Sequence, residues 1–268
     1  TAMGGAQYVH TFDKCFFMPS DLTAGLEYNR DRLKDNMWGY NRHTDQTVNI
    51  YSAFLQNEWK NDRWGILIGG RLDKHNLIDH IIFSPRANLR FNPTQNINLR
   101  LSYSSGFRAP QAFDEDMHIE NVGGTVAMIE RAKDLKEEKS QSFSASADMY
   151  HRFGAFQTNL LIEGFYTRLT DVFVLGEPYD RGDGILVKTR SNGPGAKVMG
   201  LTLEGKVAYL SILQIQAGLT LQRSRYDEPH KWHDDAPAEK KIFRTPDTYG
   251  YFTATCTPIK PLSIALSG

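Results

Sequence analysis

The 268-residue sequence lacks any apolar run that approaches the roughly 20 residues of a membrane-spanning helix. Its mean hydropathy is -0.46, with 40% hydrophobic residues, which are values that water-soluble proteins share. These values exclude a helical membrane protein. They do not exclude a membrane β-barrel, because strands with polar side chains on one face keep the mean hydropathy low.

Cysteine is also scarce, and the formal net charge is zero. The two cysteines, Cys15 and Cys256, lie far apart in the sequence and do not have the spacing of a metal site. A disulfide, two free thiols and incidental placement all remain open. Lys+Arg and Asp+Glu number 31 each, so no net charge favours nucleic acid or an acidic surface as a partner.

Catalytic motifs are missing from the sequence. It has no Gly-x-Ser-x-Gly elbow, no His-Glu-x-x-His and no glycine-rich phosphate loop. We therefore expect neither an enzyme nor a bound cofactor. Two segments rich in carboxylates and histidine, 114–118 and 230–235, are more simply explained as solvated loops, and we assign no metal site to them.

What the sequence does contain is a repeated alternation of apolar and polar residues. The clearest run covers residues 213–221, and residues 97–104 and 199–209 show the same pattern. Because successive side chains of a strand point to opposite faces, each run makes one apolar face and one polar face. A soluble β-sandwich would show the same alternation with its apolar face turned inward, so the alternation alone does not separate the two architectures.

The lengths of the connections between strands distinguish a membrane barrel from a soluble sandwich. Transmembrane barrels have tight turns on one side of the membrane and long loops on the other. We therefore predict about twelve antiparallel strands that run alternately down and up, with the loops at 31–46, 108–138 and 227–245 outside the cell. The 12% aromatic content near predicted strand ends fits an interfacial girdle. The predicted short connections are at 14–20, 60–63, 92–95, 153–154, 209–212 and 257–261, and the other longer ones are at 76–80 and 175–184.

Two segments interrupt this pattern. Pro85 cannot donate to a strand ladder, but the residues around it keep alternating, so we expect a strand start or a bulge there. Residues 192–195 lie within what otherwise forms one long strand over 185–209, and they predict a bulge or kink. Residues 262–268 begin another strand that stops in mid-run. Because an unclosed sheet leaves unpaired edges, we expect the chain to be a piece of a larger barrel.

Four motifs carry a family resemblance, and the last of them consists of two segments. They are GFRAP within residues 102–118, FSPRANLRF at 83–91, AKDLKEEKSQSFSAS at 132–146, and RSNGPGAKVMGLTLEG at 190–205 followed by FRTPDTYGYFTAT at 243–255. In this order, and in register with the predicted strands, they resemble the C-terminal barrel of TonB-dependent outer-membrane receptors, which include siderophore and colicin receptors.

The resemblance implies an all-β, antiparallel, up-and-down transmembrane β-barrel of which about 12 of 22 strands are present. Residues 1–268 would form a fragment of the barrel domain, and the plug domain and the closing C-terminal strands would lie outside it. It also implies the outer membrane of a Gram-negative bacterium, with membrane lipid around the barrel. TonB would act as a partner through the absent N-terminal region, so no residue of this chain is assigned to energy coupling.

The function that the resemblance implies is active import of a scarce nutrient. A ferric siderophore is the leading cargo, and cobalamin or a glycan are the alternatives. A passive outer-membrane channel, which would need no plug, and an all-β surface binding module, which would be soluble without detergent, are alternatives from other classes. Since loops carry recognition, the candidate ligand contacts lie in or next to the long loops. They are Trp38, Tyr40, Arg42, His43, Arg108, Tyr226, Trp232 and His233. For Arg108 the alternative is a structural ion pair.

Overall fold

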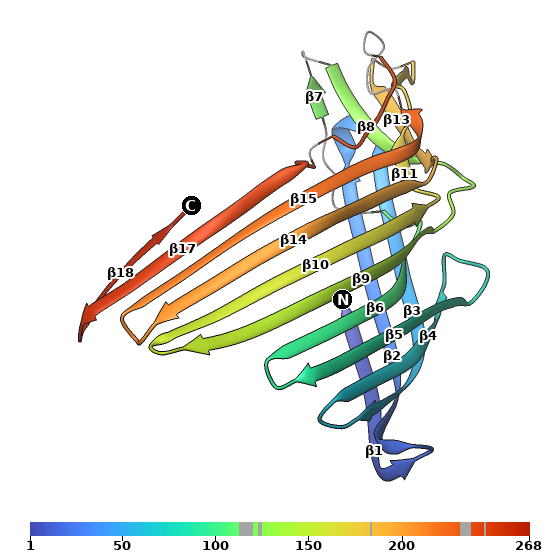
Figure 1. Ribbon diagram of the computed structural model, residues 1–268. Coiled ribbons are helices and arrows are strands. Elements are labelled where there is room, and N and C mark those ends of the chain that lie inside the picture. The colour runs from blue at the N-terminus through green and yellow to red at the C-terminus, as the bar shows by residue number, and fades with distance from the viewer. Residues whose placement is uncertain (113–119, 123–124, 183, 231–236, 244) are drawn as a thin grey trace.

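The computed structural model describes residues 1–112, 120–122, 125–182, 184–230, 237–243 and 245–268. These residues are almost entirely β-structure (Figure 1). The helical element among them is one 3-10 turn, η1 (Trp38–Tyr40). Within these ranges, every helix is too short and too polar to cross a bilayer.

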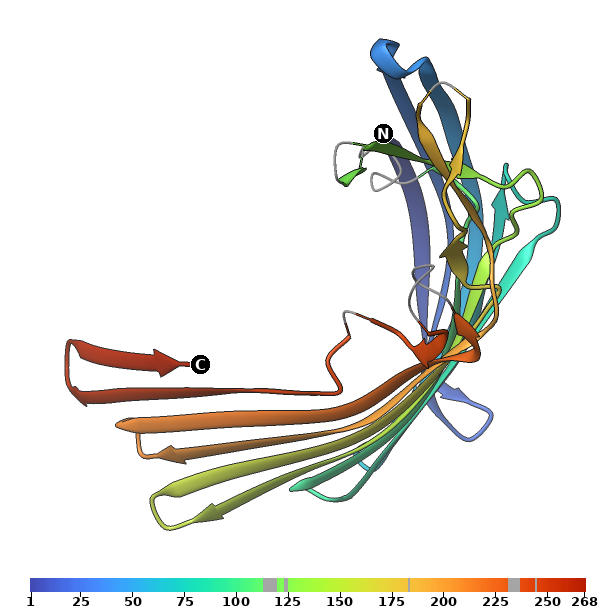
Figure 2. The ribbon, with the colours of Figure 1, turned by 90° about the horizontal axis from the view of Figure 1, so that it is seen from above.

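Twelve strands follow one another in a continuous antiparallel sheet, the main sheet, and β16 (Glu239–Lys241) pairs with its strand β15. The main sheet curves around an open space when it is seen from above (Figure 2). The predicted architecture, an open part of an up-and-down barrel, is confirmed. The twelve strands, in their order across the sheet, are β1 (Ala2–Cys15), β2 (Met18–Met37), β3 (Arg42–Lys60), β4 (Trp64–His75), β5 (Ile82–Thr94), β6 (Ile97–Arg108), β9 (Glu138–Phe153), β10 (Phe156–Thr170), β14 (Ala196–Tyr209), β15 (Leu213–His230), β17 (Thr248–Ile259) and β18 (Leu262–Ser267).

Tight turns join the strands at one end of the main sheet, as the connection lengths predict. They cover residues 16–17, 61–63, 95–96, 154–155, 210–212 and 260–261. Phe16 and Leu210 adopt positive φ angles of 62° and 48° in two of these turns, and Gly154 has a φ of 58° in a third. The longer connections lie at the opposite end of the sheet, which we call the loop end.

The predicted loop at 31–46 is wrong over most of its length. β2 and β3 continue to pair from Asp31 with Val48 up to Met37 with Arg42. Polar and charged residues occupy both faces of this part of the ladder, and Arg32 forms an ion pair with Asp45 at 2.7 Å. The alternation of apolar and polar residues therefore ends before residue 31, although the two strands continue beyond it.

A second, smaller sheet stands above the loop end of the main sheet (Figure 1). Its strands β8 and β13 are parallel neighbours, and Met128 and Val187 face each other across them with exposed fractions of 0%. The predicted interruption at 192–195 is present, but it is a break and not a bulge within one long strand over 185–209, because β13 pairs only within this second sheet and β14 begins after residues 193–195. The strands of the second sheet are β7 (Glu120–Val122), β8 (Thr125–Arg131), β11 (Phe173–Leu175), β12 (Tyr179–Asp180) and β13 (Leu186–Asn192).

Pro85 lies inside β5, where it faces Gly70 of β4. Pairing with β6 begins one residue later, at Arg86 with Ser104. The missing amide donor of Pro85 therefore falls where the β5–β6 ladder starts, and the strand is not broken, as predicted.

The register extends the alternation of the sequence across the sheet and gives it two chemically different faces. The apolar face includes the cross-strand row Leu89, Leu101, Ala145, Gly164, Leu201 and Leu221. The polar face includes the neighbouring row Asn88, Ser102, Ser144, Phe165, Gly200 and Gln222. Leu101, Leu201 and Leu221 have exposed fractions of 54%, 41% and 46%. These leucines therefore do not pack in a dry protein interior, which a soluble sandwich would require.

Aromatic side chains of the apolar face gather at two levels. Near the tight turns, Trp64 stacks on Phe91 with ring centroids 4.3 Å apart, and Phe156 lies 4.9 Å from Tyr209. Toward the loop end, Tyr28 contacts Tyr51 and Tyr103 contacts Phe143. Two aromatic belts separated by aliphatic residues are the arrangement expected of interfacial girdles.

Candidate functional site

The loop end of the β2–β3 hairpin presents the first group of predicted ligand contacts. Trp38 is 79% exposed, and its ring makes an edge-on contact with the His43 ring, with ring centroids 4.7 Å apart. His43 also lies 3.2 Å from the Asn36 side-chain oxygen. Arg42, whose side chain is 11% exposed, pairs with Asp35 at 3.0 Å. Tyr40 is the last residue of η1. The hairpin thus brings Trp38 and His43 together as an exposed aromatic pair, whereas Arg42 is already engaged by a carboxylate.

Arg108 and Tyr226 occupy different surroundings. Arg108 ends β6, opposite Glu138, and its guanidinium carbon lies 5.4 Å from the centre of the Phe173 ring. Tyr226 is buried in a small apolar cluster with Val172 and Ala196. Both side chains connect the main sheet to the segments that lead into the second sheet. Such packing favours a structural role for Tyr226 over direct ligand contact.

Trp232 and His233 lie outside the described residues. So do the clustered carboxylates and histidine at 114–118, together with the carboxylates at 234 and 235. Within the described ranges, no group of three or more metal-ligating side chains comes together.

The polar face carries a buried ion-pair network that the sequence analysis missed. The Asp73 carboxylate, 3% exposed, accepts hydrogen bonds from the Ser52 hydroxyl at 2.6 Å and from Arg71 Nε at 2.8 Å. The other side of the Arg71 guanidinium pairs with Glu27 at 2.7 Å. The network therefore joins β2, β3 and β4 by side chains as well as by their ladders.

The segment after β6 folds over this network. The Gln111 side-chain oxygen lies 3.4 Å from Nε2 of His75, a residue with an exposed fraction of 0%. The backbone amide of Ala112 donates to the Gln46 side chain at 2.8 Å. The chain that follows the GFRAP segment therefore lies against the polar face of β3 and β4, at the loop end of the open space.

A second network crosses the polar face near β14, β15 and β17. The Glu204 carboxylate accepts hydrogen bonds from the Tyr251 hydroxyl at 2.6 Å and from Gln216 at 3.1 Å, and Lys206 lies 3.4 Å away. Tyr251 has room for this contact because it crosses Gly218, whose missing side chain leaves space for the ring. The polar face thus holds fixed hydrogen-bonding groups along its length, which suits a hydrated passage better than a protein core.

Two long connections interlock at the loop end. The Asn192 side chain accepts a hydrogen bond from the Lys136 amide at 2.8 Å and donates to the Asp171 carbonyl at 2.9 Å. Next to this contact, Glu137 is 7% exposed and lies 3.0 Å from both His80 and Lys139. Burial raises the pKa of Glu137, but a backbone hydrogen bond and these two neighbours outweigh burial, and the pKa is lowered. The connections around residues 136 and 192 are therefore held together by hydrogen bonds at the loop end.

Sequence signals for these networks exist but are weak. Asp73 and Glu204 lie at polar-face positions of their strands, and the alternation indicates that face. It does not indicate which polar residues meet across strands, because that depends on the exact register of each pair.

Comparisons with known proteins agree with this geometry. A family model described as TonB dependent receptor-like, beta-barrel, matches residues 4–255. The siderophore receptor PirA from Pseudomonas aeruginosa is similar in structure, with a TM-score of 0.76 at 16% identity, covering 99% of this chain and 47% of that one. PirA from Acinetobacter baumannii gives a TM-score of 0.70 at 16% identity, covering 98% of this chain and 41% of that one.

The iron transporter FrpB from Neisseria meningitidis gives a TM-score of 0.64 at 15% identity, covering 98% of this chain and 42% of that one. The chain thus spans less than half the length of these three structures. At such identities the likeness establishes the fold. No curated protein sequence matches the chain.

Proposed function

The chain belongs to the TonB-dependent receptor family, in its β-barrel domain, and from this premise we propose that it forms part of an outer-membrane receptor that imports a ferric siderophore with energy from TonB. The family consists of transport receptors of the Gram-negative outer membrane. In our proposal residues 1–268 are a fragment of the barrel, which a plug domain and further strands complete.

The observation that carries the proposal is the two-faced sheet. Its apolar face keeps leucines exposed between two aromatic belts, which is the surface that a bilayer requires. Its polar face carries fixed ion pairs and hydrogen-bonded networks, which suit the wall of a hydrated interior. The siderophore and iron receptors among the similar structures support the choice of cargo.

We further propose that Trp38 and His43 contact the cargo. Trp38 is exposed at the tip of the longest hairpin, and Arg108, whose guanidinium lies over the Phe173 ring, is a cation at the end of β6. Aromatic faces and cations suit an anionic, ring-bearing chelate. Arg42, Tyr226, Trp232 and His233 remain weaker predictions, because Arg42 pairs with Asp35, Tyr226 is buried, and Trp232 and His233 lie outside the described residues. Tyr40 also stays a prediction.

The test is cargo uptake in cells that lack the full-length gene. Under iron limitation, the deletion strain is expected to lose uptake of one radiolabelled ferric siderophore from a panel, and a strain without TonB is expected to lose the same uptake. Cobalamin or a labelled glycan in the same panel identifies the alternative cargoes. Uptake that persists without TonB would indicate a passive channel and contradict the proposal.

The contact residues are tested by Trp38→Ala in the full-length receptor, with Phe16→Ala as the matched control. Both aromatics are highly exposed, but Phe16 lies in a tight turn at the opposite end of the sheet. We expect Trp38→Ala to weaken binding of the identified cargo about tenfold, because a stacked aromatic contributes roughly 1 kcal/mol or more. Equal affinities of the two variants would remove Trp38 from the site.

A further inference from the structure

Residues 109–112, which we call the strap, leave the end of β6 and lie across the polar face of β3 and β4. At its start, Ala109 is buried and packs in one cluster with Ile78. At its end, the Ala112 amide donates a hydrogen bond to the Gln46 side chain of β3 at 2.8 Å. The strap is thus a connection between strands that is fixed to the main sheet at both of its ends.

His75, the last residue of β4, holds the middle of the strap. Its side chain has an exposed fraction of 0%, and its Nδ1 accepts a hydrogen bond from the Leu77 amide at 3.0 Å. Because an amide only donates, this Nδ1 carries no proton, and the neutral ring carries its hydrogen on Nε2. Nε2 lies 3.4 Å from the side-chain oxygen of Gln111. One neutral tautomer therefore serves both the connection after β4 and the strap.

A proton on Nδ1 breaks this arrangement. The Leu77 amide then faces a second N–H group and loses its acceptor, and a buried donor without an acceptor is costly. Leu77 precedes Ile78, whose amide donates to the His75 carbonyl at 3.2 Å. Rearrangement of this turn therefore also removes Ile78 from its contact with Ala109.

Charged groups lie on the elements that pack around the ring, but they offer a protonated His75 little compensation. Asp73 acts on the ring electrostatically, although Arg71 already holds its carboxylate at 2.8 Å. The strap has the sequence Ala-Pro-Gln-Ala and supplies no carboxylate, so burial of the ring opposes its second proton. The other charged or titratable groups are Glu27 of β2, which pairs with Arg71, the exposed Asp79 and His80 after β4, and Arg131 of β8, which donates to the Pro110 carbonyl at 3.1 Å.

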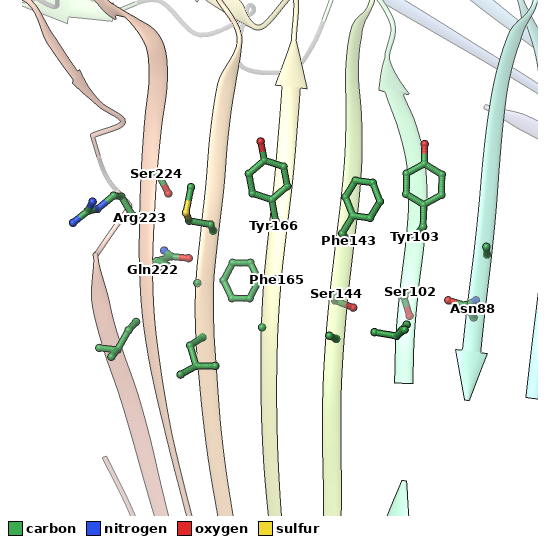
Figure 3. Close-up of a pocket in the computed structure, with 18 of the residues that line it drawn as sticks. Asn88, Ser102, Tyr103, Phe143, Ser144, Phe165, Tyr166, Gln222, Arg223 and Ser224 are labelled. Carbon is green, nitrogen blue, oxygen red and sulfur yellow. The ribbon is translucent and has the colours of Figure 1, made fainter. Parts of the chain in front are cut away.

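We propose that the strap is an acid-sensitive latch, which neutral His75 keeps closed on the polar face and which protonation of His75 releases. Release uncovers Gln46 and the ring itself, so access to this part of the polar face depends on pH. Tyr103, Phe143 and Tyr166 lie side by side on three neighbouring strands (Figure 3), and the strap follows β6 beyond Tyr103. In the membrane location proposed above, the strap therefore lies on the outer side, where the external pH reaches it.

The experiment is hydrogen exchange of the full-length receptor in lipid nanodiscs, followed by mass spectrometry of peptides that cover the strap. Exchange is measured at about pH 7.5 and about pH 4.5, on either side of the histidine range. Rates are converted to protection factors, so that the effect of pH on intrinsic exchange cancels. The test variant is His75→Asn, whose side-chain oxygen replaces Nδ1 as an acceptor but does not titrate. The matched control is His80→Asn, which removes a nearby ring that is 56% exposed and pairs with Glu137.

We expect the protection factor of the strap in the parent to fall about tenfold at the lower pH, which is the effect of losing about one buried hydrogen bond. His75→Asn should show no such fall, and His80→Asn should behave like the parent. A second variant, Gln46→Ala, removes the acceptor of the Ala112 amide and should lower protection about tenfold at both pH values.

Equal protection of the parent strap at both pH values would overturn the proposal, and this result does not depend on the folding of any variant. A fall that persists in His75→Asn or disappears in His80→Asn would assign the pH dependence to another group and also overturn it. An equal loss of protection in peptides of β9 and β10 would show general unfolding and contradict a local release. Cargo enters none of these measurements, so a failure of the siderophore assignment is distinguishable from a failure of the latch.

Discussion

Gly200 offers the sharpest test of the register of the main sheet. It lies on the polar face of β14, under the ring of Phe165. A Cβ atom added there would lie 2.6 Å from the main-chain oxygen of Leu221 and 2.6 Å from Cζ of Phe165. Ordinary contacts of this kind begin near 3.4 Å, so both neighbours must retreat by about 0.8 Å. The ring can rotate away, but the Leu221 oxygen belongs to the neighbouring strand.

We therefore expect Gly200→Ala to destabilise the protein. Overpacking costs about 1–3 kcal/mol, and loosening one ladder hydrogen bond adds about 1 kcal/mol. Replacing glycine returns roughly 0.4–1 kcal/mol by restricting the unfolded chain. The net loss in free energy of unfolding is then about 1–3 kcal/mol.

The matched control is Gly205→Ala on the same strand. A Cβ atom at Gly205 meets nothing within 4 Å, so only the effect on the unfolded chain remains. We expect Gly205→Ala to leave the free energy of unfolding unchanged or to raise it by up to about 1 kcal/mol. The measurement is urea unfolding of the full-length receptor in lipid, followed by tryptophan fluorescence. If the two alanine variants unfold at the same urea concentration, the register around Gly200 is wrong.

Three further predictions concern other parts of the chain. Asp73→Ala should lower the free energy of unfolding by about 2–4 kcal/mol, because it removes two charge-assisted hydrogen bonds and leaves Ser52 unsatisfied. Glu27→Gln, at the exposed end of the same network, should lower it by only about 0–1 kcal/mol. Similar losses for the two variants would refute the network. The lowered pKa of Glu137 means that its carboxylate stabilises the fold above the ordinary glutamate range, near 4.3, and that this contribution is lost as the pH falls through the lowered pKa. Glu137→Gln should therefore be less stable than the parent in urea unfolding at pH 7, and the difference should vanish in acid; a constant difference would contradict this. Leu210→Gly should raise the free energy of unfolding by up to about 1 kcal/mol, because Leu210 has a φ of 48°, a left-handed conformation that glycine adopts with less strain. A lower free energy of unfolding would show that the turn depends on the leucine side chain.

The sequence predicts the part of the fold in which one face of a strand is apolar. Each tight turn overlaps a predicted short connection, and the strand ends around Arg108 and Leu262 follow the alternation closely. The alternation disappears where both faces are polar, and for that reason the sequence predicts a loop at 31–46, where the structure continues the β2–β3 hairpin. Parallel pairing of β8 with β13 joins residues about 60 positions apart, and no local pattern indicates it.

The candidate site was predicted less completely for a similar reason. Trp38 and His43 stand out because large aromatic residues in a long connection invite a functional reading, and the structure brings them into contact. Asp73 and Arg71 are ordinary polar-face residues in the sequence. Their importance arises only when β2, β3 and β4 align and bury the carboxylate. Both cysteines are free thiols in the structure, so the disulfide among the alternatives that their spacing left open does not form there.

The main sheet has no protein core of its own, and this fact connects its stability to its proposed surroundings. The two clusters of buried apolar residues in the described chain both lie at the loop end, around Ile78 and around Val172. Between the aromatic belts, leucines such as Leu101 and Leu221 stay about half exposed. Full burial of one leucine side chain contributes about 1.5–3 kcal/mol to the free energy of unfolding. The contribution lost by leaving many such side chains in water would therefore exceed the total stability of an ordinary domain. In the proposed outer-membrane location, lipid against the apolar face supplies the missing burial without any further protein contact. In the proposed receptor the polar face is left free to line a passage, so the surface that stabilises the sheet and the surface that serves the proposed transport are its two opposite faces.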